Sequence, residues 1–236
     1  MLQISGMGTG STVGSKRSSS SSKAWLPVRW GDLRRTQPFS SHYGFDRGTP
    51  IDRYYVLRFF EKYQQHIRGD VLEIQMTGYT QMFGHDVRWS ESVDIDPQHN
   101  TTHVCDLAHS EGRLSSNRYD CFLMPNTLNH LRELEPCLEH ALRVLKPGGT
   151  ILATTATLVP LTPDFLDYWR LSPAGWKEVA TRVWPGCHVS LEVYGNVLAA
   201  TAAMMGLACE ELMRQELDVG DPRYPVLIGL ACQKPS

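Results

Sequence analysis

Three carboxylic acids follow short apolar segments of this 236-residue chain. Glu73 stands in "VLEI", Asp94 in "SVDID" and Asp106 in "THVCDL". Asp94 follows Glu73 by 21 positions, close to the spacing of about 20 residues at which an acid meets the ribose of a bound nucleotide. Any one of these acids fits a solvated residue or a helix cap better than a ligand contact. Three in succession indicate a nucleoside pocket, because a carboxylate accepts two hydrogen bonds from ribose hydroxyls at once.

The segment "VLEIQMTGYT" (71–80) carries the first acid into a turn that is poor in glycine. Nucleotide-binding turns normally use glycines, which adopt positive φ and let the backbone approach the ligand. Gln75, Met76 and Thr77 stand at these positions here, and only Gly78 remains. The segment therefore argues against a loop that cradles phosphate.

Apolar and amphipathic segments alternate along the chain, which predicts the elements that position these acids. Strands are expected over 71–74, 92–96, 102–107, 119–125, 150–157, 188–195 and 224–234. Helices are expected from Thr49 and Pro50 to residue 66, over 135–145 up to the "KPGG" turn, from Ser172 onward and over 196–214.

Strands separated by helices of this size imply right-handed crossovers and a mainly parallel sheet, covered by helices on both faces. Ligands of such sheets bind beyond the carboxyl ends of the strands. The three acids and the region around Asn126 are therefore expected on one edge of the sheet.

The composition is that of an ordinary globular protein, with 42% hydrophobic and 20% charged residues. A net charge of -2 predicts no nucleic-acid partner. The six cysteines form no CxxC pair, which argues against a disulfide framework or a zinc site and fits a reducing cytoplasm. The histidines show no HxxxH or HExxH spacing, so we expect no metal. No apolar run is long enough for a membrane span.

The domain organisation is predicted as a tail and one domain. Residues 1–24 are rich in glycine and serine and contain no apolar stretch, so they predict a disordered tail and not a secretory signal. Residues 25–236 are predicted to form a single domain, of which 25–68 make an N-terminal cap segment and a helix.

The order of these motifs resembles that of class I S-adenosylmethionine-dependent methyltransferases, from about Arg47 to Lys234. The segments that carry the resemblance are "VLEI", "VDID", "CDL", "YDCFLMPNTLNHL", "ALRVLKPGGTILAT" and "DYWRLSPAGWKEV". The resemblance implies a Rossmann-like α/β fold, in which seven mostly parallel strands have helices on both faces and the last strand is antiparallel. It also implies S-adenosylmethionine as the cofactor.

A narrower resemblance is to a bacterial branch of this family that is linked to glycosyltransferase and secondary-metabolism clusters. It rests on "RGTPIDRYY", "YGNVLAATA" and "YPVLI". In this branch only the first glycine of the turn is usual, and Gln75 stands in its place. Methyl donors carry no phosphate. The missing glycines argue against a phosphate-binding loop, and they argue less strongly against binding of a methyl donor. Gln75 then supplies a polar contact, reduces the affinity for the cofactor, or marks a pocket that no longer transfers methyl groups.

The resemblance assigns roles to the acids at the strand ends. Glu73 is expected beside the methionyl amino group. Asp94 is expected at the ribose hydroxyls, with Asp96 as the alternative. Asp106 is expected at the adenine amino group, and the backbone amide of Leu107 at the adenine ring.

Further cofactor contacts are expected around the methionyl end. Arg53 and Tyr54 at the start of the first helix are expected over the pocket, and the guanidinium of Arg53 suits the cofactor carboxylate through its two-pronged geometry. A surface ion pair is the alternative for Arg53. The remaining expected contacts are Gln75, Tyr79, Thr80 and Asn126.

Three residues are the candidates for the chemistry at the acceptor. His130 is the first choice for a base because histidine titrates near neutrality, and packing beside a helix is an equal alternative. Tyr168 and Arg170 are expected to line an acceptor pocket together with Trp169, and packing of this loop on the sheet is again an equal alternative.

The sequence therefore predicts a methyltransferase that acts on a small-molecule acceptor at oxygen, nitrogen or carbon, with an aromatic secondary-metabolite precursor as one example. Two other hypotheses stay open. One is a protein of this fold that binds the cofactor and catalyses a non-methyl reaction such as cyclisation, and the other is a non-catalytic scaffold partner. Met204 and Met205 are expected in the core, and a homodimer face is the alternative.

Overall fold

The computed structural model describes residues 28–163 and 166–236. The tail predicted over residues 1–24 lies outside these described residues. Contacts between residues divide the chain into two units, Met1–Arg34 and Arg35–Ser236. The described part of the first unit holds one short 3-10 helix, η1 (Gly31–Leu33). All that follows concerns the second unit, and the single domain from residue 25 onward stays a prediction.

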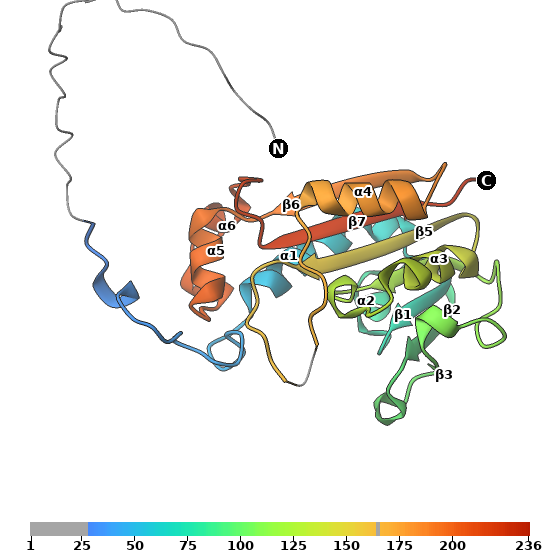
Figure 1. The fold of residues 1–236 in the computed structure, drawn as a ribbon, viewed down its shortest axis with the longest axis horizontal. Helices are drawn as coiled ribbons and strands as arrows, with labels where there is room; N and C mark the ends of the chain where they lie inside the picture. The colour runs from blue at the N-terminus through green and yellow to red at the C-terminus, as the bar shows by residue number, and fades with distance from the viewer. Residues whose placement is uncertain (1–27, 164–165) are drawn as a thin grey trace, which may run out of the picture. The chain divides into compact units, whose positions relative to one another are not determined.

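Seven strands form one sheet in the order β3-β2-β1-β4-β5-β7-β6 (Figure 1). Their bounds are β1 Gly69–Ile74, β2 Val87–Asp94, β3 His103–Val104, β4 Tyr119–Met124, β5 Leu145–Ala156, β6 His188–Tyr194 and β7 Leu227–Gln233. The neighbours from β3 to β5 pair in parallel, and β7 runs antiparallel between β5 and β6. The prediction of a mostly parallel seven-stranded sheet with an antiparallel last strand is confirmed.

The helices lie on both faces of this sheet. They are α1 Ile51–Tyr63, α2 Gly78–Phe83, α3 Leu134–Val144, α4 Pro173–Val183, α5 Val197–Met204 and α6 Arg214–Asp218. Short 3-10 helices join them at η2 Gln64–His66, η3 Pro97–His99, η4 Leu107–His109, η5 Leu128–His130 and η6 Cys209–Glu211.

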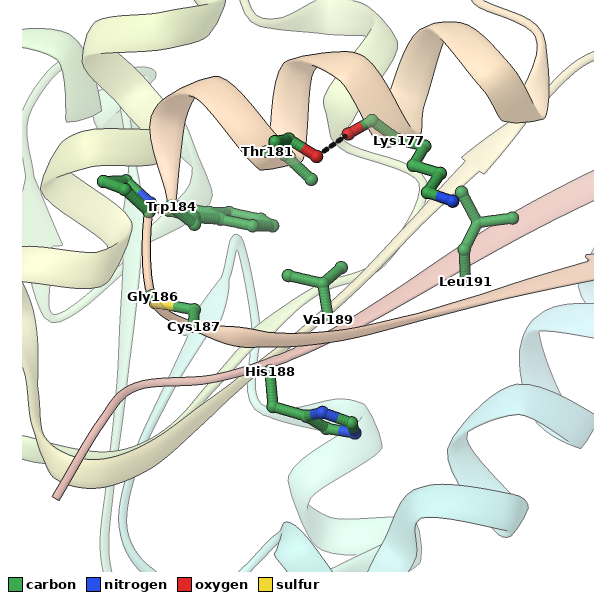
Figure 2. A pocket seen from close by; sticks show the side chains of 10 residues that line it. Lys177, Thr181, Trp184, Gly186, Cys187, His188, Val189 and Leu191 are labelled. Atoms are coloured by element: carbon green, nitrogen blue, oxygen red, sulfur yellow. Dashed lines mark hydrogen bonds between the residues drawn. The ribbon is translucent and has the colours of Figure 1, made fainter.

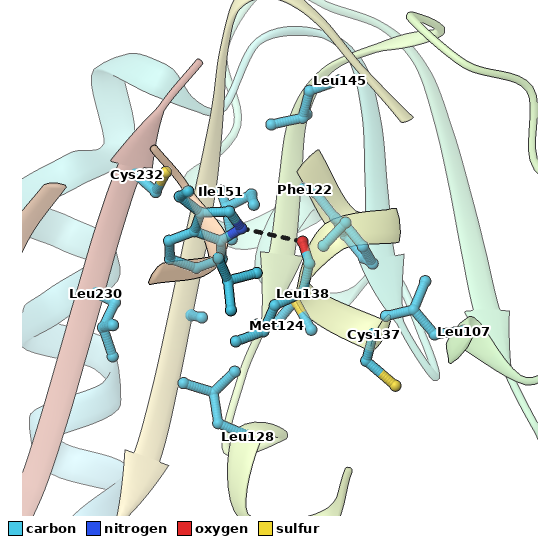
Figure 3. Packing of buried hydrophobic residues seen from close by; sticks show 14 of the residues in the cluster. Leu107, Phe122, Met124, Leu128, Cys137, Leu138, Leu145, Ile151, Leu230 and Cys232 are labelled. Atoms are coloured by element: carbon cyan, nitrogen blue, oxygen red, sulfur yellow. Dashed lines mark hydrogen bonds between the residues drawn. The ribbon is translucent and has the colours of Figure 1, made fainter. Parts of the chain in front are cut away.

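Each face of the sheet has its own apolar core, because successive side chains of a strand point to opposite faces. In β4, Phe122 and Met124 pack with α3 and α4, while Cys121 and Leu123 pack with α1 and α5. Figure 3 shows the first of these cores, where the indole Nε1 of Trp184 donates a hydrogen bond to the carbonyl of Leu138 at 3.0 Å.

The second core depends on a close approach of α1 to β7. A Cβ atom added at Gly229 would lie 2.4 Å from the ring of Phe59. Only glycine leaves room for this ring. The contact fixes α1 against the sheet and so sets the position of the first turn of α1, which reaches the carboxyl edge.

The predicted helix over 196–214 is wrong, because the chain contains two helices there. After α5 ends, Gly206 adopts a φ of +68°. Its N–H and that of Leu207 donate to the carbonyls of Ala203 and Ala202, which is the hydrogen-bond pattern that ends a helix at a left-handed glycine. After η6, the next α-helix, α6, starts only at Arg214. Met204 at the end of α5 is exposed, so its predicted place in the core is wrong.

Further boundaries differ from the sequence prediction: β2 spans Val87–Asp94 and not 92–96, and β7 starts at Leu227 and not at 224. β5 begins at Leu145, so the "KPGG" segment lies within the strand, where Gly148 has a φ of +78°. β3 is two residues long and not six, because Asp106 already caps η4. The segment 78–83, expected as part of a loop, forms α2.

Candidate functional site

The carboxyl ends of β1, β2 and β4 lie side by side. In the sheet register, Glu73 pairs with Ser92 of β2 and with Leu123 of β4, and the N–H of Gln75 donates to the carbonyl of Val93 at 2.9 Å. The acids at these strand ends therefore share one edge of the sheet, which is the geometry that the sequence predicted.

Glu73 is fully buried and holds the start of α2. Its carboxylate accepts hydrogen bonds from the N–H groups of Tyr79 and Thr80, at 3.0 and 2.9 Å, and from the hydroxyl of Thr80 at 2.7 Å. Burial raises the pKa of Glu73 above its usual value, although the hydrogen bonds from Thr80 and Tyr79 oppose the shift. The structure thus brings three predicted cofactor residues together, and the role of Glu73 at the methionyl amino group stays a prediction.

Gln75 occupies the turn in a left-handed conformation, with a φ of +68°. This conformation is strained for a residue with a side chain and costs on the order of 1–3 kcal/mol. It is the conformation for which glycine is normally used at this position. The turn therefore has a backbone conformation that glycine adopts without strain, and its role as a cofactor loop stays a prediction.

His99 lies between the side chains of Gln75 and Asp94. Nε2 of Gln75 lies 3.2 Å from the Nε2 of His99, whose Nδ1 lies 2.8 Å from Oδ2 of Asp94. His99 ends η3. Sequence reasoning missed His99, and the only signal was its position five residues after Asp94 in a proline-started turn.

The other two acids cap short helices. Asp96 accepts a hydrogen bond from the N–H of Gln98 at 2.8 Å and is the N-cap of η3. Asp106 accepts one from the N–H of Ala108 at 2.9 Å and is the N-cap of η4, which begins at the buried Leu107. The capping alternative, considered for each acid from the sequence, therefore applies to both, and a ligand contact of Asp106 stays a prediction.

The first turn of α1 meets the same edge of the sheet. Asn126, in a left-handed conformation just after β4, donates from Nδ2 to Oδ2 of Asp52 at 2.8 Å. Arg53 donates a hydrogen bond to the hydroxyl of Tyr79. Tyr54 instead donates to Asp218 of α6 at 2.7 Å. Of the two α1 residues predicted at the cofactor, Arg53 joins the loop and Tyr54 lies against α6.

Asp52 is an acid that the sequence offered only as part of the helix start. Burial is the main reason why its pKa is raised, while Arg53 and the hydrogen bond from Asn126 act in the opposite direction. The signal that could have found it is its place directly before Arg53 in "TPIDRYY", but nothing local shows that this carboxylate meets β4.

Of the catalytic candidates, His130 ends η5 after β4, and Tyr168 and Arg170 lie in the segment between β5 and α4. Nδ1 of His130 lies 2.9 Å from the carbonyl oxygen of Leu166, and the N–H of Tyr168 donates to the carbonyl of Asn129 at 2.8 Å. Arg170 bonds Asp167 within its own segment. The contacts of His130 and Tyr168 join the segment after β5 to the segment after β4. Acceptor roles for His130, Tyr168 and Arg170 stay predictions.

Two cavities lie at different distances from the carboxyl edge of the sheet. A cavity of about 10 Å³ lies between Asp52, Tyr43, the segment 158–160 and α5. A larger one of about 520 Å³ lies between α4 and β6 and is lined by Lys177, Thr181, Trp184 and Val189 (Figure 2). Because β6 is parallel to β5 and begins at His188, this larger hollow faces the amino ends of the parallel strands and lies away from the acids.

Within residues 28–163 and 166–236, no group of three or more His, Cys, Asp or Glu side chains is placed to hold a metal ion. No helix of these residues is long and apolar enough to cross a membrane.

The residues at the carboxyl edge fit S-adenosylmethionine. Asp94 and Asp106 end neighbouring strands and present carboxylates, which accept hydrogen bonds from ribose hydroxyls and from an adenine amino group. Gln75 keeps the positive φ of the loop. Arg53 bonds Tyr79 beside this loop, and its place at the cofactor carboxylate, which a guanidinium would suit, stays a prediction.

Comparisons with known proteins agree with this fold. A methyltransferase domain family matches residues 81–153, from within α2 to within β5. The match begins after Gln75. No curated protein sequence matches the chain.

Solved structures show the same fold at low sequence identity. A SAM-dependent methyltransferase from Archaeoglobus fulgidus is 15% identical with a TM-score of 0.51, covering 78% of this chain and 94% of its own. A SAM-dependent methyltransferase from Mesorhizobium loti is 12% identical with a TM-score of 0.53, covering 81% and 100%. Phosphoethanolamine N-methyltransferase 2 from Haemonchus contortus is 15% identical with a TM-score of 0.50, covering 78% and 53%.

The strand order with its antiparallel β7 defines the class I methyltransferase fold. The chain therefore has the class I methyltransferase fold, and its residues 81–153 match a methyltransferase domain family. S-adenosylmethionine is the cofactor of this class.

Gln75→Gly is expected to tighten the binding of S-adenosylhomocysteine about 3- to 10-fold, because it removes a side chain from the loop and its contact with His99. The variant should also be slightly more stable, since glycine adopts the positive φ without strain. Calorimetric titration and urea unfolding measure the two effects.

Gln75→Ala is the matched control, because it removes the side chain and keeps the backbone strain. It should tighten binding without gaining stability. Weaker binding by both variants would show instead that the amide of Gln75 contacts the cofactor.

Proposed function

We propose that the protein transfers the methyl group of S-adenosylmethionine to a small-molecule acceptor with an apolar or aromatic part. The observation that carries this proposal is the position of Asp94 at the carboxyl end of β2, beside the Gln75 turn and next to the buried Glu73. This arrangement offers a ribose contact at the point where a cofactor crosses the edge of the sheet.

The proposal assigns a role to each of these residues at the carboxyl edge of the sheet. Asp94 holds the ribose hydroxyls after exchanging its bond to His99. Asp106 and the amide of Leu107 receive the adenine. The buried carboxylate of Glu73 holds Tyr79 and Thr80 in the first turn of α2 in place. When bound, the cofactor supplies an electrophilic methyl group, and the protein's main contribution is to align the acceptor with it.

The acceptor end of the site is proposed to lie between α1, α5 and the segment that follows β5. Leu158, Val159 and Pro160 line the small cavity there, and the exposed Tyr168 follows in the same segment. Apolar and aromatic side chains favour an acceptor with apolar surface. The net charge of -2 gives no support for a nucleic-acid acceptor.

The finer parts of the proposal rest on the motifs of the sequence. "RGTPIDRYY" and "YGNVLAATA" support the bacterial branch linked to secondary metabolism. All six cysteines are free thiols, which supports a reducing compartment such as the cytoplasm. The atom that receives the methyl group is oxygen, nitrogen or carbon. His130 and Arg170 both contact the segment after β5, and they are proposed to orient the acceptor through this segment.

A specific observation favours a second candidate, a protein that binds the cofactor without transferring its methyl group. His99 already engages the ribose acid, and Gln75 stands where the family has glycine. Both features reduce the room and the hydrogen-bonding capacity left for a cofactor.

The test measures binding and transfer separately. The full chain is titrated with S-adenosylmethionine in a calorimeter and then incubated with methyl-labelled cofactor and a panel of phenols, indoles, amines and carbon acids. Binding with transfer of label to at least one acceptor is the expected result. Binding without any transfer favours the second candidate, and no binding at millimolar cofactor contradicts both.

A further inference from the structure

The carboxylate of Asp52 connects the cofactor edge with the small cavity. On one side its Oδ2 accepts a hydrogen bond from Nδ2 of Asn126, 74 residues away and directly after β4. On the other side Asp52 lines the cavity of about 10 Å³. The neighbouring residue Arg53 bonds Tyr79, which follows the cofactor loop. Asp52 thus stands between the place of the cofactor and the place proposed for the acceptor.

The cavity beside Asp52 suits the reacting end of an acceptor. Its volume is about that of a single water probe, and its other walls include Ile51, Leu158, Val159 and Ala203. Asp52 is the one carboxylate among its lining residues. A polar group that enters there with an attached hydrogen finds one strong acceptor in otherwise apolar surroundings.

The charged and titratable groups around Asp52 leave its carboxylate only partly compensated. Arg53 of the same helix, Tyr79 of α2 and Tyr43 of the preceding segment face this region. Asn126 after β4 is neutral, and the residues of the 158–160 segment and of α5 in the cavity are apolar. Burial is the largest influence on the pKa of Asp52 and raises it. A carboxylate with a raised pKa is a stronger base than one in water.

We propose that Asp52 is the general base of the methyl transfer, and that it accepts the proton of an O–H or N–H acceptor whose reacting end enters the cavity. The inference rests on the proposed function. The acceptor atom loses its proton to the carboxylate of Asp52 and forms a bond to the methyl carbon. The methyl–sulfur bond breaks, its electron pair stays on sulfur, and the products are the methylated acceptor, a neutral thioether and a protonated Asp52. Asn126 is the positioning residue that orients the carboxylate.

Asp52→Asn tests the role of the base in the full chain. The variant keeps an oxygen that can accept the bond from Asn126, and it loses the ability to take a proton. We expect kcat to fall about 10²- to 10⁴-fold, with the affinity for S-adenosylhomocysteine changed less than threefold. In the wild type, kcat/KM should fall as the pH falls through the raised pKa of Asp52, and this acidic limb should be missing in the variant. Glu61→Gln, an exposed acid on the same helix, is the matched control and should keep the wild-type rate and profile.

A second readout needs no acceptor. Because the pKa of Asp52 is raised in the folded state, its ionisation is harder there than in the unfolded chain, so it destabilises the fold increasingly as the pH rises above about 3.8. Asp52→Asn should therefore have a higher Tm than the wild type at pH 7, by about 2–4 °C. The difference should shrink towards acidic pH.

The outcomes separate this inference from the proposed function. An active wild type combined with an Asp52→Asn variant that retains kcat within threefold, and the same pH profile, overturns Asp52 as the base and leaves methyl transfer in place. A lower Tm of the variant by the same amount at every pH assigns Asp52 a structural role and also overturns the inference. A wild type that binds the cofactor and methylates no acceptor contradicts the proposed function, and the inference with it.

Discussion

Asp94→Ala is expected to weaken the binding of S-adenosylhomocysteine about 10- to 100-fold. The variant removes a carboxylate at the carboxyl end of β2, and a hydrogen bond to a charged group contributes about 1.5–3 kcal/mol. His99, which bonds Asp94, loses its partner at the same time. Calorimetric titration of the full chain measures the change, with thermal unfolding as a check that the variant folds.

Two matched variants distinguish Asp94 from its neighbours Asp96 and His99 as the residue that contacts the ribose. Asp96→Ala removes the alternative ribose acid, which in the structure caps η3, and should change the affinity less than threefold. His99→Ala leaves Asp94 in place and removes its competitor, so binding should become tighter or stay the same. A larger loss in Asp96→Ala than in Asp94→Ala would assign the ribose to Asp96. A large loss in His99→Ala would show that His99 itself contacts the cofactor.

Glu73→Ala is expected to lower the free energy of unfolding by about 3 kcal/mol or more. The side chain is fully buried and accepts three hydrogen bonds from Tyr79 and Thr80. Truncation leaves these donors without an acceptor inside the protein, and each unsatisfied buried group costs about 1–3 kcal/mol. Urea unfolding of both proteins, followed by circular dichroism, measures the difference.

Glu73→Gln separates the shape of this side chain from its charge. Glutamine keeps one acceptor oxygen and brings two N–H groups towards donors, so an intermediate loss of stability is expected. The control Glu61→Gln should stay within about 0.5 kcal/mol of the wild type, because Glu61 is exposed. A Glu73→Ala variant as stable as the control would show that α2 does not depend on this carboxylate. Cofactor binding by a folded Glu73→Gln variant then tests whether Glu73 also contacts the methionyl end.

The predicted elements differ in how well the sequence specified them. β1, β4 and β6 agree with their predicted bounds to within two residues, because short apolar segments between turns carry a strong local signal. The helix over 196–214 looked continuous because alanine and methionine favour helix throughout. Only the contacts of Gly206, whose added Cβ would lie 2.3 Å from the carbonyl oxygen of Ser40, explain why it ends early.

The candidate site divides in the same way. Glu73, Asp94 and Asp106 could be placed on one edge because the carboxyl ends of parallel strands meet there, whatever the details of packing. The residues that contact these acids could not be predicted from the sequence. His99 reaches Asp94 through a turn whose path depends on Asp96, and Tyr79 reaches Glu73 only because 78–83 forms a helix.

By itself, the sequence determined the fold class, the carboxyl edge and the acids on it, since strand periodicity and right-handed crossovers are local or general properties of the chain. The tertiary structure alone decided what each acid does on that edge. It buried Glu73 against α2, set His99 on Asp94, and brought Asp52 of α1 to Asn126 of the loop after β4. The last of these contacts joins residues 74 apart along the chain, and it forms only when α1 packs against the sheet.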